Sequence, residues 1–159
     1  MAAKAKKLTT FLWFDGQAEE AAKFYCSVFK GAEPGDVTRW PQGMEKAGQV
    51  LTAEFRAFGQ DFCCLNGGPE FKFNESVSFS IPCETQEEID FYWERLLAGG
   101  GKESACGWLK DKYGVSWQVD PPILLELIKS KDQAKAKRVM EAMMKMVKID
   151  IAKIREAAK

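Results

Sequence analysis

The spacing of apolar and polar positions in the first half of the chain predicts a strand, a helix and three further strands. Residues 8–14 form an apolar run of strand length, which Asp15-Gly16 interrupts. Residues 17–30 carry apolar side chains at helical spacing, with an acidic first turn and a glycine after the last turn. The strands expected after this helix are 37–40, 49–57 and 61–65, of which the last two form a hairpin.

The second half repeats this order of elements. A strand is predicted at 77–83 and a helix at 86–98, with Thr85 or Glu84 near its cap and three glycines after it. Two more strands, 102–109 and 115–119, surround a turn, and the middle strand of this module is expected to be short or merged around Trp108. A shift of 68 residues places Phe11–Trp40 on Phe79–Trp108, and a shift of 55 places 58–64 on 113–119. We therefore expect two duplicated β-α-β-β-β modules, 8–68 and 76–120, packed face to face around any functional site.

Residues 121–159 are predicted to form a C-terminal helical extension. After Pro121-Pro122 we expect a short helix at 123–129 and then one or two helices within 132–159. An apolar stripe at helical spacing should pack on the body of the protein or on a second subunit. A homodimer is the expected assembly. The stripe consists of Val139, Met140, Met143, Met146 and Val147.

The amino-acid composition limits the kinds of molecule that we expect the protein to bind. Lys plus Arg and Asp plus Glu both number 23, so no basic field attracts nucleic acid. The apolar runs are shorter than the roughly 20 residues that span a membrane, and no signal-length segment follows the lysine-rich N-terminus. Five cysteines without framework spacing or a CxxC pair favour buried thiols in a reducing compartment. We therefore expect a cytoplasmic protein without nucleic-acid or membrane partners.

Histidine is absent from the sequence. This absence excludes Ser-His-Asp and Cys-His catalysis, histidine general bases and metal sites that contain imidazole.

Several separate motifs resemble one protein family. They are similar to the PhnB-like subgroup, which carries the label 3-demethylubiquinone-9 3-methyltransferase, within the vicinal oxygen chelate superfamily of glyoxalase I, extradiol dioxygenases and bleomycin-resistance proteins. The resemblance implies an α+β glyoxalase-like domain, residues 1–120, whose paired modules form a curved sheet around a cup-shaped cavity. The motifs are 12–16 (LWFDG), 19–21 (EEA), Gly107-Trp108 with Asp111, 114–118 (GVSWQ) and 138–143 (RVMEAM).

The resemblance also implies where a metal would be bound. In the metal enzymes of the superfamily, each module supplies one ligand from its first strand and one from its last. Here those positions correspond to Thr10, Cys63, Ser78 and Gln118. Neutral hydroxyl and amide oxygens with one thiol bind transition metals poorly, so we expect neither a metal nor another cofactor. The methyltransferase label gains no support, because no glycine-rich nucleotide-binding loop follows a first strand.

The aligned positions predict the lining of the cup. Strand alternation would direct Phe11 and Trp13 of the first module, and Phe79 and Ile81 of the second, toward the helix. The neighbouring residues would face the cup. An apolar and aromatic lining with a few neutral hydrogen-bonding groups suits a small, neutral, flat or aromatic ligand. The candidate ligand-binding residues are Thr10, Leu12, Phe14, Cys63, Ser78, Ser80 and Gln118, with Trp40 and Trp108 flanking the ligand.

Two other interpretations remain open at the level of sequence. One is an enzyme that needs no metal, either a lyase or isomerase or the labelled methyltransferase, whose catalytic residues we cannot assign. Loss of turnover in Cys63→Ala or Gln118→Ala would favour it. The other is a structural dimer whose C-terminal extension binds a partner.

Overall fold

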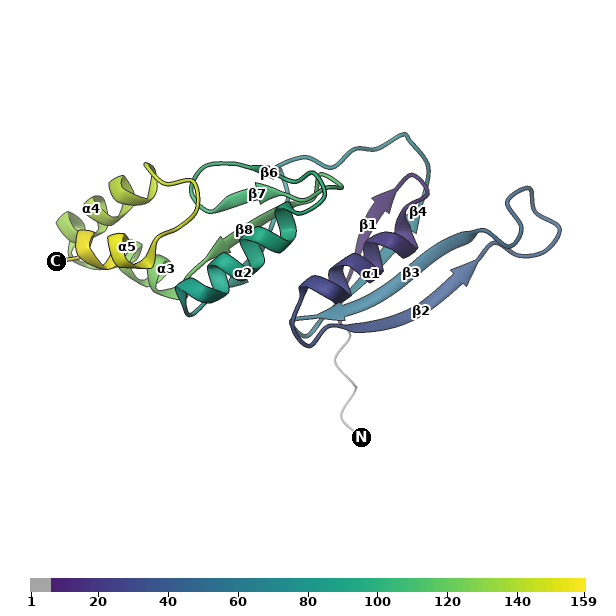
Figure 1. Ribbon diagram of the computed structural model, residues 1–159, viewed down its shortest axis with the longest axis horizontal. Helices are drawn as coiled ribbons and strands as arrows, with labels where there is room; N and C mark the ends of the chain where they lie inside the picture. Colours follow the sequence, from purple (N-terminus) through teal and green to yellow (C-terminus); the bar gives the residue numbers. More distant parts are fainter. Residues whose placement is uncertain (1–6) are drawn as a thin grey trace. The chain divides into compact units, whose positions relative to one another are not determined.

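The computed structural model describes residues 7–159, which divide into two compact units, 7–72 and 73–159. Each unit contains one sheet with a helix on it, and the C-terminal helices belong to the second unit (Figure 1). The lysine-rich residues 1–6, which the predicted domain 1–120 includes, lie outside the described residues. The predicted α+β fold with two similar modules is confirmed.

The first unit is a four-stranded sheet with strand order β1-β4-β3-β2. Strand β1 runs parallel to β4, and the other neighbours are antiparallel. Strand β2 begins earlier than the predicted range 37–40, because an edge strand tolerates Pro34 and Gly35. The elements are β1 (Thr9–Phe14), α1 (Ala18–Val28), β2 (Glu33–Arg39), β3 (Val50–Ala57) and β4 (Gln60–Asn66).

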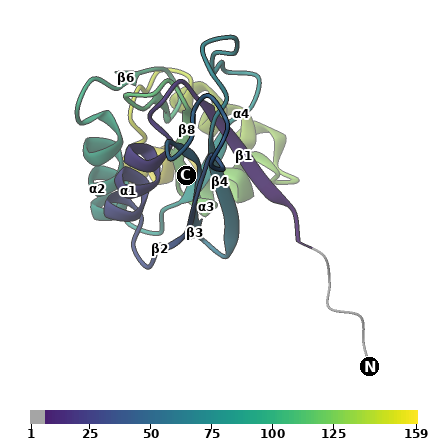
Figure 2. The same ribbon diagram turned by 90° about the vertical axis from the view of Figure 1, so that its right-hand side faces the viewer.

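Helix α1 covers one side of this sheet, as Figures 1 and 2 both show. The Tyr25 ring stacks on Phe55 at a centroid distance of 5.2 Å, and Phe55 stacks on Phe62 at 4.7 Å. The Asn66 side chain accepts a hydrogen bond from Ala18 N at 2.9 Å and so caps the first turn of the helix. These contacts fix which face of each strand meets the helix.

The second unit has the same topology, with strand order β5-β8-β7-β6. The single strand predicted at 102–109 is wrong, because a loop divides it into two strands. Cys106 and Gly107 adopt positive φ angles of 61° and 82°. Their N–H groups donate to the carbonyl oxygens of Met146 and Val147 instead of to a sheet neighbour. The elements are β5 (Phe79–Pro82), α2 (Gln86–Leu97), β6 (Lys102–Glu103), β7 (Trp108–Lys110) and β8 (Ser116–Asp120).

The C-terminal extension folds onto the second unit. It forms three helices, α3 (Pro122–Ile128), α4 (Gln133–Met143) and α5 (Ile151–Ala157), so the range 132–159 contains two helices rather than one. Val139 of the predicted apolar stripe is buried within the unit, whereas Val147 is 47% exposed. Within residues 7–159, the helices are all too short or too polar to cross a membrane.

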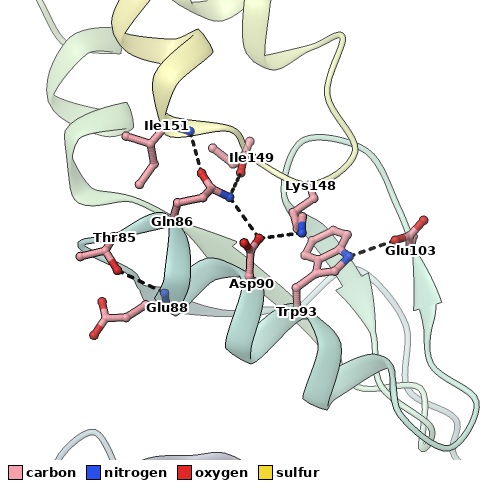
Figure 3. A network of polar contacts seen from close by, with 9 residues as sticks. All are labelled: Thr85, Gln86, Glu88, Asp90, Trp93, Glu103, Lys148, Ile149 and Ile151. Carbon is pink, nitrogen blue, oxygen red and sulfur yellow. Dashed lines mark hydrogen bonds and ion pairs between the residues drawn. The ribbon is translucent and has the colours of Figure 1, made fainter.

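The segment 146–151 between α4 and α5, which we term the strap, is held by the first turns of α2 (Figure 3). The Gln86 side-chain amide donates to Ile149 O at 3.1 Å and accepts from Ile151 N at 3.0 Å. Lys148 Nζ lies 2.6 Å from Asp90 Oδ1. Together with the bonds from Cys106 and Gly107, these contacts fix the extension to its own module.

Candidate functional site

Strand register shows which residues of the first sheet lie on the side of α1. Phe55 contacts Tyr25 of α1, so Ala53, two residues earlier, lies on the same side. Ala53 is the register partner of Cys64, and Cys64 is the partner of Leu12. Leu12 is accordingly 3% exposed and Phe14 is also buried, whereas Phe11 is 61% exposed.

The predicted orientation of the first strand is therefore wrong. Thr10, Leu12 and Phe14 lie on the side of α1, and Phe11 and Trp13 lie on the side opposite the helix. We term the side opposite the helix the far face of each sheet. Of the predicted strand residues in this unit, Cys63 alone lies on the far face, beside its register partner Phe11. The Thr10 hydroxyl accepts a hydrogen bond from Gln60 Nε2 at 2.7 Å.

In the second sheet the predicted orientation is correct. Trp93 Nε1 of α2 donates to Glu103 Oε1 at 3.0 Å, which places Glu103 and its register partner Leu109 on the side of the helix. Leu109 pairs with Trp117, and Trp117 pairs with Phe79. The alternate residues form the far face, which includes Ser80, Trp108, Lys110, Ser116 and Gln118.

A difference of one residue between the modules explains the error in the first strand. The register partners Cys64 and Val119 correspond at the predicted shift of 55, so Leu12 corresponds to Ile81, which follows it by 69 positions. In the helices the buried Tyr25 corresponds to Trp93, which follows it by 68. The connection between strand and helix is thus one residue shorter in the second module. A slip of one residue moves every side chain of a strand to the other face.

The structure brings four predicted site residues together on the second sheet. Gln118 of β8 pairs in register with Ser80 on one side and with Trp108 on the other. Its side-chain amide donates to Ser78 Oγ at 2.8 Å. Ser80 Oγ donates to Asp120 Oδ1 at 3.1 Å, and burial of the Asp120 carboxyl raises its pKa above the ordinary value.

The side chains at the positions aligned with the superfamily's metal ligands are poorly suited to bind a metal. The corrected alignment makes Thr9, rather than Thr10, the counterpart of Ser78. Ser78 and Gln118 are hydrogen-bonded to each other. Burial is the main cause that raises the pKa of the Cys63 thiol, and the Glu54 carboxylate adds to it, so the thiolate that binds metals is disfavoured. Residues 7–159 contain no cluster of three or more His, Cys, Asp or Glu side chains that could hold an ion.

A pocket of about 200 Å³ adjoins Trp108 in the second unit. It includes a residue that the sequence reasoning missed. Ser116 is 2% exposed, and its Oγ has no hydrogen-bond partner among the described residues. Alternation could have identified it, because Ser116 stands two residues before Gln118 on the same strand. The other polar or aromatic residues that line the pocket are Glu75, Lys102, Glu103, Ser104, Trp108 and Lys110.

Trp40 lies in a different pocket, of about 300 Å³, at the end of the first sheet. The pocket is mainly polar, with Asp15, Glu19, Lys46 and Asn66 in its wall. Glu19 is already paired with Lys23 at 2.7 Å, and Asn66 is used to cap α1. That Trp40 and Trp108 flank one ligand in a cup stays a prediction.

Comparison with protein families and with solved structures identifies proteins that are similar to this chain. Residues 6–120 match the family described as 3-demethylubiquinone-9 3-methyltransferase. A Bacillus cereus structure described as a 3-demethylubiquinone-9 3-methyltransferase, PhnB protein, is 39% identical with a TM-score of 0.65, and the match covers 73% of this chain and 99% of the other. None of the curated proteins matches the chain.

More distant structures share the fold. Protein PA1353 from Pseudomonas aeruginosa is 17% identical with a TM-score of 0.61, over 74% of this chain and 98% of the other. The fosfomycin resistance protein FosX from Listeria monocytogenes is 19% identical with a TM-score of 0.54, over 82% of this chain and 100% of the other. The chain therefore belongs to the family described as 3-demethylubiquinone-9 3-methyltransferase, which includes the PhnB protein.

Proposed function

We propose that the protein binds a small, neutral, flat or aromatic molecule on the far face of its second sheet. The observation that carries this proposal is the strand register that places Ser80, Gln118 and Trp108 side by side. The half-exposed indole of Trp108 offers a surface for stacking, and the pocket beside it can accept part of a ligand. The Ser78–Gln118 pair offers uncharged hydrogen-bonding groups next to the indole.

The charges around this face also favour a neutral ligand. The pocket beside Trp108 has two ammonium groups, Lys102 and Lys110, and two carboxylates, Glu75 and Glu103, in its wall. Lys110 forms an ion pair with Glu75, which lowers the pKa of the Glu75 carboxyl. The formal charges of the wall cancel, so the pocket has no excess charge to attract an ion.

The proposal can be tested by a titration with 2-naphthol, followed through the indole Nε1–H signals in ¹H–¹⁵N NMR spectra. The chain has 5 tryptophans, and Trp108→Phe identifies one of the signals by its disappearance. We expect the Trp108 signal to shift most. Trp108→Leu should weaken binding by about fivefold, as isothermal titration calorimetry measures it, since an aromatic pair contributes about 1 kcal/mol.

Trp40→Leu is the matched control, because it makes the same change in the polar pocket of the first unit. It should leave the affinity for 2-naphthol unchanged. The proposal is wrong if the two leucine variants weaken binding equally, or if Trp108→Leu has no effect.

The alternative of a metal-independent enzyme, including the labelled methyltransferase, has no specific observation in its favour. The Cys63 thiol is buried with a raised pKa, which disfavours its use as a nucleophile. The expected absence of a cofactor stays a prediction. A cytoplasmic location is likewise a proposal, and the five free thiols support it.

A further inference from the structure

We propose that the ligand of this far face carries a carbonyl oxygen, which accepts a hydrogen bond from Ser116 Oγ in the pocket beside Trp108. This inference rests on the proposed function, because it names the chemical class of the molecule bound there. Its starting point is the buried Ser116 hydroxyl, which has no partner among residues 7–159. Such groups are rare in folded proteins, because burial without a hydrogen bond is unfavourable.

Ser116 lines the pocket, and its buried Oγ has no partner in the fold among the described residues. Ser116 lies on the far face, with Lys110 of β7 as its register partner. The Lys110 ammonium forms an ion pair with Glu75 and makes no hydrogen bond with the neighbouring hydroxyl. The open space beside Ser116 is the pocket of about 200 Å³ that Trp108 also lines. A ligand stacked on that indole has room to extend a polar atom toward Ser116.

The hydrogen-bonding groups in the wall of the pocket favour a ligand atom that accepts hydrogen bonds. Both carboxylates are engaged, Glu75 with Lys110 and Glu103 with Trp93 Nε1. Ser116 Oγ has no hydrogen-bond partner within the described part of the chain, and Lys102 and Ser104 line the same pocket with exposed side chains. All three can donate, and the Lys102 ammonium can only donate, so these groups are complementary to a ligand oxygen. Because the wall has no net charge, a neutral carbonyl fits it better than a carboxylate.

Two ligands of the same shape test this assignment. Acetophenone has a carbonyl group where α-methylstyrene has a methylene group. Both are titrated into the wild-type protein and into Ser116→Ala, with the Trp108 indole signal as the readout. We expect the variant to bind acetophenone about fivefold more weakly, as the loss of one hydrogen bond implies. Its affinity for α-methylstyrene should change by less than about twofold.

Ser130→Ala is the control, because Ser130 lies outside the pocket and its hydroxyl already accepts a hydrogen bond from Asp132 N. It should leave both affinities unchanged and lower the Tm slightly. Ser116→Ala should have a Tm at least equal to that of the wild type, because it removes an unpartnered polar group. A lower Tm for Ser116→Ala would overturn the inference by showing that the hydroxyl has a partner within the fold.

The remaining outcomes separate the inference from the proposed function. If both ligands shift the Trp108 signal but Ser116→Ala binds acetophenone as tightly as the wild type, the carbonyl assignment fails and ligand binding at the face stands. If neither ligand shifts the signal in the wild type, whereas 2-naphthol does, the carbonyl assignment again fails alone. If all three ligands leave the signal unchanged, the proposed function fails as well.

Discussion

At the scale of the residue, Asp111 shows how a motif can be structural. Asp111 is 3% exposed, and its carboxylate accepts hydrogen bonds at the turn between β7 and β8. Oδ1 accepts from Tyr113 N at 2.9 Å and from Val115 N at 3.1 Å, and Oδ2 accepts from Trp117 Nε1 at 2.9 Å. Gly114 completes the turn with a φ of 91°, a conformation that favours glycine. These family-like residues therefore hold the hairpin that positions Gln118.

We predict that Asp111→Ala lowers the free energy of unfolding by about 3 kcal/mol, because it leaves two backbone amides and an indole N–H without their acceptor in the interior. Urea denaturation followed by circular dichroism measures this change. Asp61→Ala is the control, since the Asp61 pair with Arg56 is exposed and 3.5 Å long. Its effect should stay below about 1 kcal/mol. Equal losses in the two variants would contradict the role given to Asp111.

At the scale of the element, the strap joins the C-terminal helices to α2 by a few polar contacts (Figure 3). Gln86 is the central residue, because one amide group serves both Ile149 O and Ile151 N. Ile149 in the strap and Ile154 in α5 are completely buried, so apolar packing accompanies the polar contacts here. Of the apolar stripe predicted from the sequence, Val139 is also completely buried within this unit.

Gln86→Leu should release the strap while leaving α2 intact, because leucine is a good helix former that cannot satisfy the two backbone groups. We expect the Ile151 amide to exchange with solvent at least tenfold faster, which is about 1.4 kcal/mol of local stability. Hydrogen-exchange NMR measures this rate. Amides in β4 of the first unit serve as the internal reference and should keep their wild-type rates. An unchanged rate at Ile151 would show that the buried isoleucines alone hold the strap.

The Asp90–Lys148 pair gives the strap a dependence on pH. The hydrogen bond from Lys148 is the main cause that lowers the pKa of Asp90 below its ordinary value of 3.8, and a second bond from Gln86 adds to it. A lowered folded-state pKa stabilises the fold above the ordinary value, and this contribution is lost as the pH falls through the folded-state pKa. Both side chains are partly exposed, so the contribution at neutral pH should be below about 1 kcal/mol.

Asp90→Asn should therefore be slightly less stable than the wild type at pH 7, and the difference should shrink as the pH is lowered below 3.8. Thermal unfolding of both proteins across this range tests the prediction. A difference in Tm that is independent of pH would show that the ion pair does not contribute.

At the scale of the whole molecule, the order of the helices and strands could be predicted from the sequence. Which side of each strand faces the helix could not be predicted in every case. The helix positions could be predicted because Ala21, Tyr25 and Val28 recur as Ile89, Trp93 and Leu96, all of them buried. The face of the first strand that meets the helix could not be predicted in the same way. The connection between strand and helix is one residue shorter in the second module, and this difference is not visible in the apolar pattern. The loop at Cys106–Gly107 was missed because its partners, Met146 and Val147, are about forty residues away along the chain, beyond the range of local patterns.

The same limits apply to the candidate site. Ser78, Ser80, Trp108 and Gln118 lie side by side, since the alignment of the second module matched its true register. That they bind a ligand stays a prediction. Ser116 was missed because its significance lies in the lack of a hydrogen-bond partner, which only three-dimensional contacts reveal. Glu75 was missed because it precedes the strand and reaches the site through its ion pair with Lys110.

The assembly of the chain is a further prediction at this scale. We expect a homodimer, with a mass twice the 17.9 kDa of the chain, and native mass spectrometry of the purified protein measures it. Part of the stripe that suggested a dimer is buried within the second unit, and Met144 and Val147 leave apolar surface exposed. A species at 17.9 kDa across the micromolar range would show that the prediction is wrong.

The one-residue difference between the two connections has a consequence for protein engineering. A chimera that copies the residues of β5 into β1 by counting back from the helix would write Phe79 at position 11 and Ile81 at position 13, both on the far face. Writing the same residues one position earlier would return both side chains to the core beneath α1. Exchange of parts between the two halves of this protein must therefore be counted separately for each strand and each helix.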